Sequence, residues 1–284
     1  MSAPSASKAD PSISGSTSST STVPTAALPA EAPSSRADTR RFLTSNVDTN
    51  ETLWQLIGYC YLTGFTSAPT FLACYLWCGF QTGGLVQLSL ALARSFSTGD
   101  HTFHKPDQQA LTSLLSFLLG TAVGRVGDKY GPKRRSWVMF ATFLMALLSL
   151  AAALCAKYSG EASVAQYRTE GSWHSATGMA ALGFASATLG LQGIVAKRLN
   201  TAFGTSVVLT TIWVELVNDP LLFARKMVKS RDYRAVSVFA TFLGGMCSAG
   251  IVFASSSAVA FGVAAGLRLI SMLSWLLVPM EKAK

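Results

Sequence analysis

The chain has 284 residues, of which 50% are hydrophobic and only 13% are charged, and its formal net charge is +9. A soluble domain carries about 25% charged residues, so this composition excludes an ordinary soluble protein. The excess of cations does not indicate nucleic-acid binding, because lysines and arginines gather in short loops between apolar segments and no nucleic-acid-binding motif is present.

Residues 1–50 form the first segment, and serine, threonine, alanine and proline dominate it. Such a stretch buries too little apolar surface to offset its chain entropy, so we expect a disordered cytoplasmic tail. It also lacks the apolar core of a secretory signal peptide.

Long apolar segments follow the tail. A membrane-crossing helix needs about 20 apolar residues, because each residue adds about 1.5 Å across a hydrocarbon layer about 30 Å thick. Six segments meet this requirement: residues 54–78, 108–125, 136–156, 175–196, 235–254 and 258–279. The sequence therefore predicts an all-α polytopic membrane protein whose first partner is the lipid bilayer.

Two further apolar segments, residues 85–96 and 204–217, are shorter and are typical of re-entrant segments. The loops at residues 125–135 and 225–234 are strongly basic, and short basic loops stay in the cytoplasm. Both loops lie on that side only if the second short segment turns back. We therefore expect six transmembrane helices, two re-entrant segments and two cytoplasmic termini, in the plasma membrane. Eight full transmembrane helices are the alternative.

The sequence also contains a weak internal repeat. GFTSA at residues 64–68 is echoed by GFASA at 183–187, and SFLLG at 116–120 is echoed by TFLGG at 241–245. The matches occur in the same order, which predicts two membrane repeats, residues 51–158 and 175–280. Three crossings in each repeat would invert the second copy, as in many transporters.

Polar residues inside the apolar segments are candidate substrate-binding residues. A charge near the bilayer centre is costly, so we expect Arg268 to have an acidic partner, with Glu215 first and Asp219 second. Re-entrant helices would also offer free backbone N–H groups to a solute. The candidates are Gln81, Thr82, Gly83, Gln192, Thr205, Thr210, Glu215, Asn218, Asp219 and Arg268. The alternative is that the small residues only permit close helix packing and that the ion pair is structural.

Catalytic motifs of soluble enzymes are absent from the sequence. No GxSxG, HExxH or Walker motif occurs, and His101 with His104 supplies too few ligands for a metal site. We therefore expect no enzymatic activity, no metal and no cofactor.

Three stretches carry a resemblance to a known family: TGFTSAPTFLACYLWCGFQTGGLVQLSLALAR, LGLQGIVAKRLN and FGTSVVLTTIWVELVND. They resemble the YoaK-like family of bacterial and fungal membrane proteins, catalogued as domain of unknown function 1275, and in particular its fungal type. The resemblance covers residues 53–280 and implies a membrane location without an established activity. In the family's first motif, an Asp and an Asn usually stand where Ser67 and Gly84 stand here.

These observations lead to two functional hypotheses. The first is a small-solute transporter or permease with its site between the two repeats. The alternative is a non-transporting membrane scaffold or regulator that acts through its cytoplasmic tail. A homo-oligomer is compatible with either hypothesis.

Overall fold

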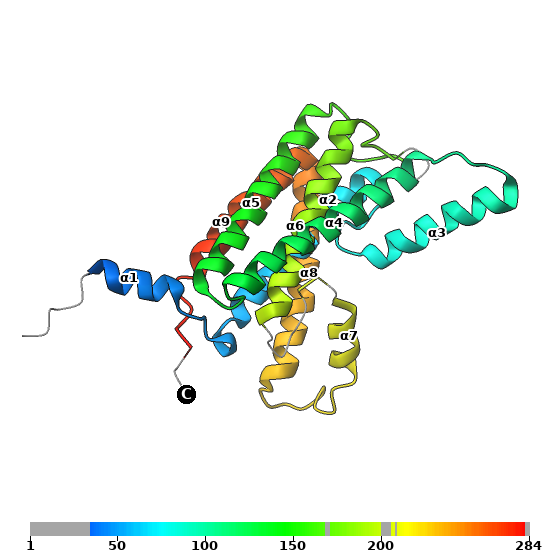
Figure 1. Cartoon of the computed structure of the whole chain (residues 1–284). Coiled ribbons are helices and arrows are strands. Elements are labelled where there is room, and N and C mark those ends of the chain that lie inside the picture. Colours follow the sequence, from blue (N-terminus) through cyan, green and yellow to red (C-terminus); the bar gives the residue numbers. More distant parts are fainter. Residues whose placement is uncertain (1–34, 168–170, 200–205, 208, 282–284) are drawn as a thin grey trace, which may run out of the picture.

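The computed structural model describes residues 35–167, 171–199, 206–207 and 209–281 (Figure 1). The helices in chain order are α1 (Ser35–Thr44), the 3-10 helix η1 (Thr49–Glu51), α2 (Leu53–Cys74), α3 (Gln81–Thr98), α4 (Lys105–Tyr130), α5 (Arg135–Tyr158), α6 (Ala176–Leu199), α7 (Leu209–Val217), α8 (Lys229–Ala254) and α9 (Ser257–Ser274). The candidate Thr205 and most of the expected tail, residues 1–34, lie outside the described residues.

Six long helices, α2, α4, α5, α6, α8 and α9, coincide with the six segments expected to cross the membrane. Within the described part of the chain, five of them, all except α2, are long and apolar enough to span a bilayer. α2 has 22 residues, but its middle carries small and hydroxyl side chains, and most of its residues are buried. The protein is therefore all-α, with several candidate membrane spans.

The helix ends differ from the expected boundaries for local reasons. α4 extends beyond the apolar segment at both ends, and its first turn is capped because the Asp107 carboxylate accepts a hydrogen bond from the His104 backbone N–H at 3.2 Å. α2 ends at Cys74, four residues before the expected end at 78, because Tyr75 has a left-handed conformation with φ of 54°.

The long helices pack in a regular set of pairs. α2 packs on α8, α4 packs on α6, and α5 packs on both α9 and α6. Glycines allow the closest approaches: a Cβ on Gly64 of α2 would meet the Thr241 carbonyl of α8, and one on Gly120 of α4 would meet the Ala187 carbonyl of α6. Small residues at such crossings let membrane helices come close enough for backbone contact.

Both strongly basic loops lie at the same end of the bundle, which we call the basic end. The strand-like residues 46 and 47 pair there with Arg134 of the α4–α5 loop and with Met280 near the C-terminus. Trp54 at the start of α2 contacts Tyr233 at the start of α8, with ring centroids 5.9 Å apart. The start of α2, the end of α9 and the two basic loops therefore share one end.

The two shorter helices start beside residues deep inside the bundle. At the start of α3, Gln81 Nε2 donates to the Ser113 hydroxyl at 3.0 Å, two turns into α4. Just before α7, the Ser206 carbonyl accepts from the Thr63 hydroxyl of α2 at 2.8 Å. From these points α7 runs to the basic end, and Figure 1 shows α3 projecting away from the bundle. Neither helix qualifies as a span among the described residues.

Residues 35–51 are part of the described fold, and residues 35–50 of them fall within the segment expected to be the tail. The Val47 and Asp48 backbone N–H groups donate to the carbonyls of Lys133 and Pro279, each at 3.0 Å, and Val47 is fully buried. We call residues 45–48, with their partners in segments 133–135 and 278–281, the terminal clasp. It fixes the end of the N-terminal segment to the basic end.

Candidate functional site

Arg268 in the middle of α9 is the centre of a buried polar network. Its side chain is completely buried, and it is surrounded by α2, α5 and α6. Nε donates to the Ser149 hydroxyl at 3.1 Å, Nη1 donates to Gln192 Oε1 at 2.9 Å, and Nη2 donates to the Thr66 hydroxyl at 3.2 Å. Nη1 also lies 3.6 Å from Met145 Sδ. The guanidinium is therefore well solvated by the protein.

All these partners are electrically neutral. No Asp or Glu of the described chain forms an ion pair or hydrogen bond with Arg268. An arginine at the centre of a membrane helix costs about 2.5–3.5 kcal/mol on insertion scales, and buried charges are usually paired. A fully buried cation with only dipolar partners is therefore an unusual feature that invites a functional explanation.

The prediction that Glu215 or Asp219 pairs with Arg268 is wrong. Glu215 and Asp219 instead hold Arg234 of α8, with Nη2 3.1 Å from Glu215 Oε2 and Nη1 3.4 Å from Asp219 Oδ2. The physical reason is position, because α7 leads away from the bundle interior and its last residues reach the basic end. Asn218 is exposed beside them.

Gln192 of α6 connects Arg268 to α2. Its Nε2 lies 2.8 Å from the Thr63 hydroxyl, 3.0 Å from the Tyr59 carbonyl and 3.3 Å from the Ser206 hydroxyl. Because Oε1 accepts from Arg268 while Nε2 donates towards α2, the orientation of this amide follows from the network. Two of the predicted site residues, Gln192 and Arg268, are thus in direct contact.

Helical spacing explains how α2 and α5 supply the remaining polar groups. Tyr59, Thr63 and Thr66 are three or four residues apart and so share one face of α2. Thr142 and Ser149 likewise share a face of α5, and Thr142 lies 2.6 Å from the Tyr59 hydroxyl. Sequence reasoning missed these five residues, although their spacing within apolar segments was a usable signal.

A cavity of about 650 Å³ lies next to the network, between α2, α7 and α8. This α2–α7–α8 cavity has the volume of a small-molecule site, which is about 300–1,000 Å³. Thr63 lines it and also contacts Gln192, so the cavity wall is two hydrogen bonds away from Arg268. The predicted residue Thr210 also lines the cavity, together with Trp213, Trp77 and Phe80.

The predicted residues at the start of α3 do not reach Arg268. Gln81 bonds the Cys78 carbonyl at 2.7 Å and Ser113, while Thr82 is exposed. Gly83 lines a second cavity of about 540 Å³ between α3 and the start of α4, where His104, Lys105 and His174 make the lining more polar. This second cavity lies at the end of the bundle opposite the basic end.

Charged groups near the second cavity are held in the loop before α4. Asp100 is paired with His104 at 2.9 Å and accepts hydrogen bonds from the Thr102 hydroxyl and backbone N–H. Hydrogen bonds from Thr102 and then from His104 hold the pKa of the Asp100 carboxyl well below its usual range. No group of three or more metal-ligating side chains occurs among the residues that the structure describes.

The fold and the buried network define the class: this is a multispan helical membrane protein with a polar core. Residues 55–274 match the family described as "Protein of unknown function (DUF1275)". The chain therefore belongs to the DUF1275 family. Neither a curated protein nor a solved structure matches the chain significantly.

Proposed function

We propose that this DUF1275 protein is a permease for a small anion, and that the anion passes between the two halves of the bundle. The observation that carries the proposal is the complete burial of Arg268 among neutral partners. A buried cation without a carboxylate has no counter-charge of its own, so an anionic solute would gain more from this position than any neutral one. On this proposal the protein transports and does not catalyse a reaction.

The α2–α7–α8 cavity supports the proposal because it provides a volume large enough for a solute beside the buried polar network. A solute in this cavity would contact Thr63 and Thr210. Only the side-chain amide of Gln192 would then separate it from the Arg268 guanidinium. Movement of the Gln192 side chain would open the remaining path, since Gln192 Oε1 is the acceptor that a solute oxygen or halide would replace. Gln192 is thus the proposed gate and Arg268 the proposed anion-binding group.

Reciprocal contacts support two inverted repeats. The pairing of α2 of the first repeat with α8 of the second is matched by the pairing of α6 of the second repeat with α4 of the first. Within the repeats, α3 on α4 is matched by α7 on α8. The echoed residues take part: Gly64 packs against Thr241, and a Cβ on its counterpart Gly183 would lie 2.9 Å from Ser116 Oγ. Residues 116 and 241 begin the second pair of matched motifs. We propose that α3 and α7 are the re-entrant helices of these repeats.

We further propose that the basic end is cytoplasmic, which would put both termini inside the cell, in the plasma membrane. The positive-inside rule supports this orientation because both strongly basic loops lie at that end. Single cysteines at Ala162 and Lys226, which are exposed at opposite ends, test it in a cysteine-free variant. An impermeant maleimide on intact cells should label only position 162; labelling only at 226 would reverse the orientation.

Flux measurements test the permease. Purified full-length protein is placed in liposomes, and swelling is followed in chloride, nitrate and formate, with glycerol as the uncharged probe. We expect anion-dependent swelling that Arg268→Gln reduces at least about tenfold, since a hydrogen bond to a charged group contributes about 1.5–3 kcal/mol. Arg225→Gln is the matched control, because Arg225 is exposed at the basic end and the charge change is the same.

Two outcomes would overturn the permease. One is swelling no faster than in protein-free liposomes for all three anions, and the other is equal anion flux in wild type and Arg268→Gln. The scaffold alternative acts through the expected tail, residues 1–50. Deletion of its residues 1–34, which leaves the terminal clasp in place, separates the hypotheses. If the shortened chain cannot replace the full chain in cells although its anion flux in liposomes is unchanged, the scaffold is favoured. We also propose the narrower YoaK-like, fungal-type affiliation, which rests on the sequence motifs, and a homo-oligomeric state, which an analysis of molecular mass in detergent would test.

A further inference from the structure

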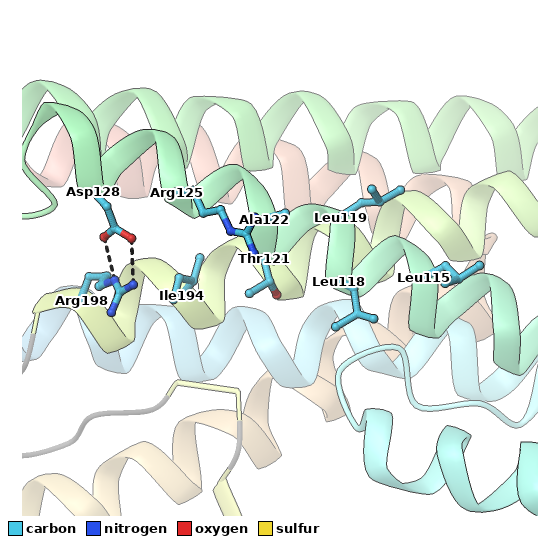
Figure 2. A pocket seen from close by; sticks show the side chains of 9 residues that line it. All are labelled: Leu115, Leu118, Leu119, Thr121, Ala122, Arg125, Asp128, Ile194 and Arg198. Atoms are coloured by element: carbon cyan, nitrogen blue, oxygen red, sulfur yellow. Dashed lines mark hydrogen bonds and ion pairs between the residues drawn. The ribbon is translucent and has the colours of Figure 1, made fainter.

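A groove of about 600 Å³ runs along the outer face of α4 and α6, away from the polar network (Figure 2). Leu115, Leu118 and Leu119 line its inner part, and each is at least half exposed. Arg125, Asp128 and Arg198 line the part nearest the basic end. The groove is therefore apolar along most of its length and charged at the end nearest the basic end.

The charges at that end are unevenly matched. Asp128 holds Arg198 through two contacts of 2.8 Å, one from Nε and one from Nη2 (Figure 2). Arg125 makes no hydrogen bond or ion pair with any described residue, and Figure 2 shows its side chain extending along α4 towards Thr121 and Ala122. One guanidinium is thus neutralised by a carboxylate, while the other is exposed and free to bind an anion.

The length of the groove matches one leaflet. Leu115 lies ten residues before Arg125 on α4, which at about 1.5 Å per residue is about 15 Å. This is half of a hydrocarbon layer about 30 Å thick. Arg125 itself lies five residues before Tyr130 at the end of α4, about 7.5 Å from the basic end, where headgroup phosphates are found. Arg125 therefore lies at the level of the lipid headgroups, and the apolar part of the groove next to it is about as long as an acyl chain.

We propose that this α4–α6 groove is a binding site for an anionic phospholipid, with the phosphate at Arg125 and one acyl chain along Leu118 and Leu119. Arginine suits this role because its planar fork of N–H donors matches phosphate oxygens. Basic pockets between membrane helices are known to bind anionic headgroups. The paired Asp128 and Arg198 form the wall beside the headgroup. The site does not depend on the permease, because it is formed by the outer faces of α4 and α6.

Native mass spectrometry of the full chain released from detergent tests the site, with phosphatidylglycerol and phosphatidylcholine of identical chains as probes. We expect phosphatidylglycerol to be retained several-fold more than phosphatidylcholine. Arg125→Gln should abolish this preference, whereas the control Arg225→Gln should retain it. Ala122→Phe fills the exposed groove without changing charge and should reduce the retention of both lipids. Thermal unfolding confirms that each variant is folded.

Glycerol 1-phosphate, which has the headgroup chemistry without chains, distinguishes a lipid site from a simple phosphate site. It should not displace phosphatidylglycerol at equal concentration. Equal retention of the two lipids by wild type would overturn the proposal, as would an unchanged preference in Arg125→Gln or displacement by glycerol 1-phosphate. Anion flux is recorded for Arg125→Gln in the same liposomes, so failure of the lipid site is distinguishable from failure of the permease.

Discussion

Nη1 of Arg268 donates to Oε1 of Gln192 at 2.9 Å, and this contact joins α9 to α6 in the interior of the bundle. Gln192 is neutral, so it orients the guanidinium without cancelling its charge. Such an arrangement differs from a structural salt bridge, in which the charge is compensated within the protein. The difference can be measured as a separation of stability from activity.

Arg268→Met should leave stability unchanged or raise it, while it abolishes anion flux. Methionine has a similar volume and relieves the desolvation of a buried charge, which costs several kcal/mol. Three acceptors lose their donor, Gln192 Oε1 and the Ser149 and Thr66 hydroxyl oxygens. The unpaired amide oxygen costs about 1–3 kcal/mol, whereas the two hydroxyls lose less because each can still donate its own proton. Denaturant unfolding in mixed micelles should therefore show a free energy of unfolding between the wild-type value and about 4 kcal/mol above it.

The control for this substitution is Arg268→Ala, which removes the charge and also leaves a cavity. It should lower the free energy of unfolding by about 2–5 kcal/mol. If Arg268→Met were as unstable as Arg268→Ala, the guanidinium would be a structural cross-link between the helices, and its role in anion binding would lose its main support.

Gly64→Ala should destabilise the protein because α2 and α8 touch at this point. A Cβ on Gly64 would collide with the Thr241 carbonyl, which is backbone and cannot rotate away. Overpacking of this kind costs about 1–3 kcal/mol. The matched control is Gly250→Ala on α8, where a Cβ meets nothing within 4 Å. That variant should gain up to about 1 kcal/mol from helix propensity. Thermal unfolding in detergent measures both, and equal behaviour of the two variants would contradict this account of the crossing.

The pKa of Asp100 should lie below the usual range of an aspartate, and the Thr102 hydroxyl should be its main cause. Removing that hydroxyl in Thr102→Val should raise the Asp100 pKa towards the usual value more than His104→Gln does. Because the folded pKa is the lower one, this carboxylate contributes to loop stability above the unfolded pKa of about 3.9. The contribution is lost as the pH falls through the folded value.

Carboxyl 13C resonances of Asp100, followed from pH 6 to pH 2 in micelles, would report this titration directly. A midpoint for Asp100 at or above the usual value in the wild type would contradict the hydrogen-bond geometry of this loop.

The helices could be predicted from sequence, but the network could not. The apolar segments 136–156 and 175–196 became α5 and α6 with small changes at their ends, because length and hydrophobicity alone require a helix in lipid. The hydrogen-bond partners of Arg268 could not be predicted in this way. Coulomb attraction favoured Glu215, whereas the actual acceptors are neutral groups spread over three helices. One sequence does not show which helices pack together, so it could not bring Ser149 or Thr66 to Arg268.

Deletions at the N-terminus should separate the tail from the terminal clasp. Residues 45–48 contribute four backbone hydrogen bonds of 3.0 Å, from Arg135 to Ser45, from Val47 to Lys133, from Asp48 to Pro279 and from Glu281 to Asn46. At about 0.5–1.5 kcal/mol each, deletion of residues 1–48 should lower the free energy of unfolding by roughly 2–6 kcal/mol. Burial of Val47 adds to this loss.

Deletion of residues 1–34 leaves all four bonds intact and is the matched control. It should leave the melting temperature in detergent within about 1 °C of the full chain, because the clasp is formed by residues 45–48, 133–135 and 278–281. A large decrease for this shorter deletion would mean that the tail stabilises the membrane domain, and it could not then be treated as a separable segment. Equal stability of both truncated chains would instead show that residues 45–48 are not held at the basic end in solution, which would remove the structural link between the N-terminus and the C-terminal segment.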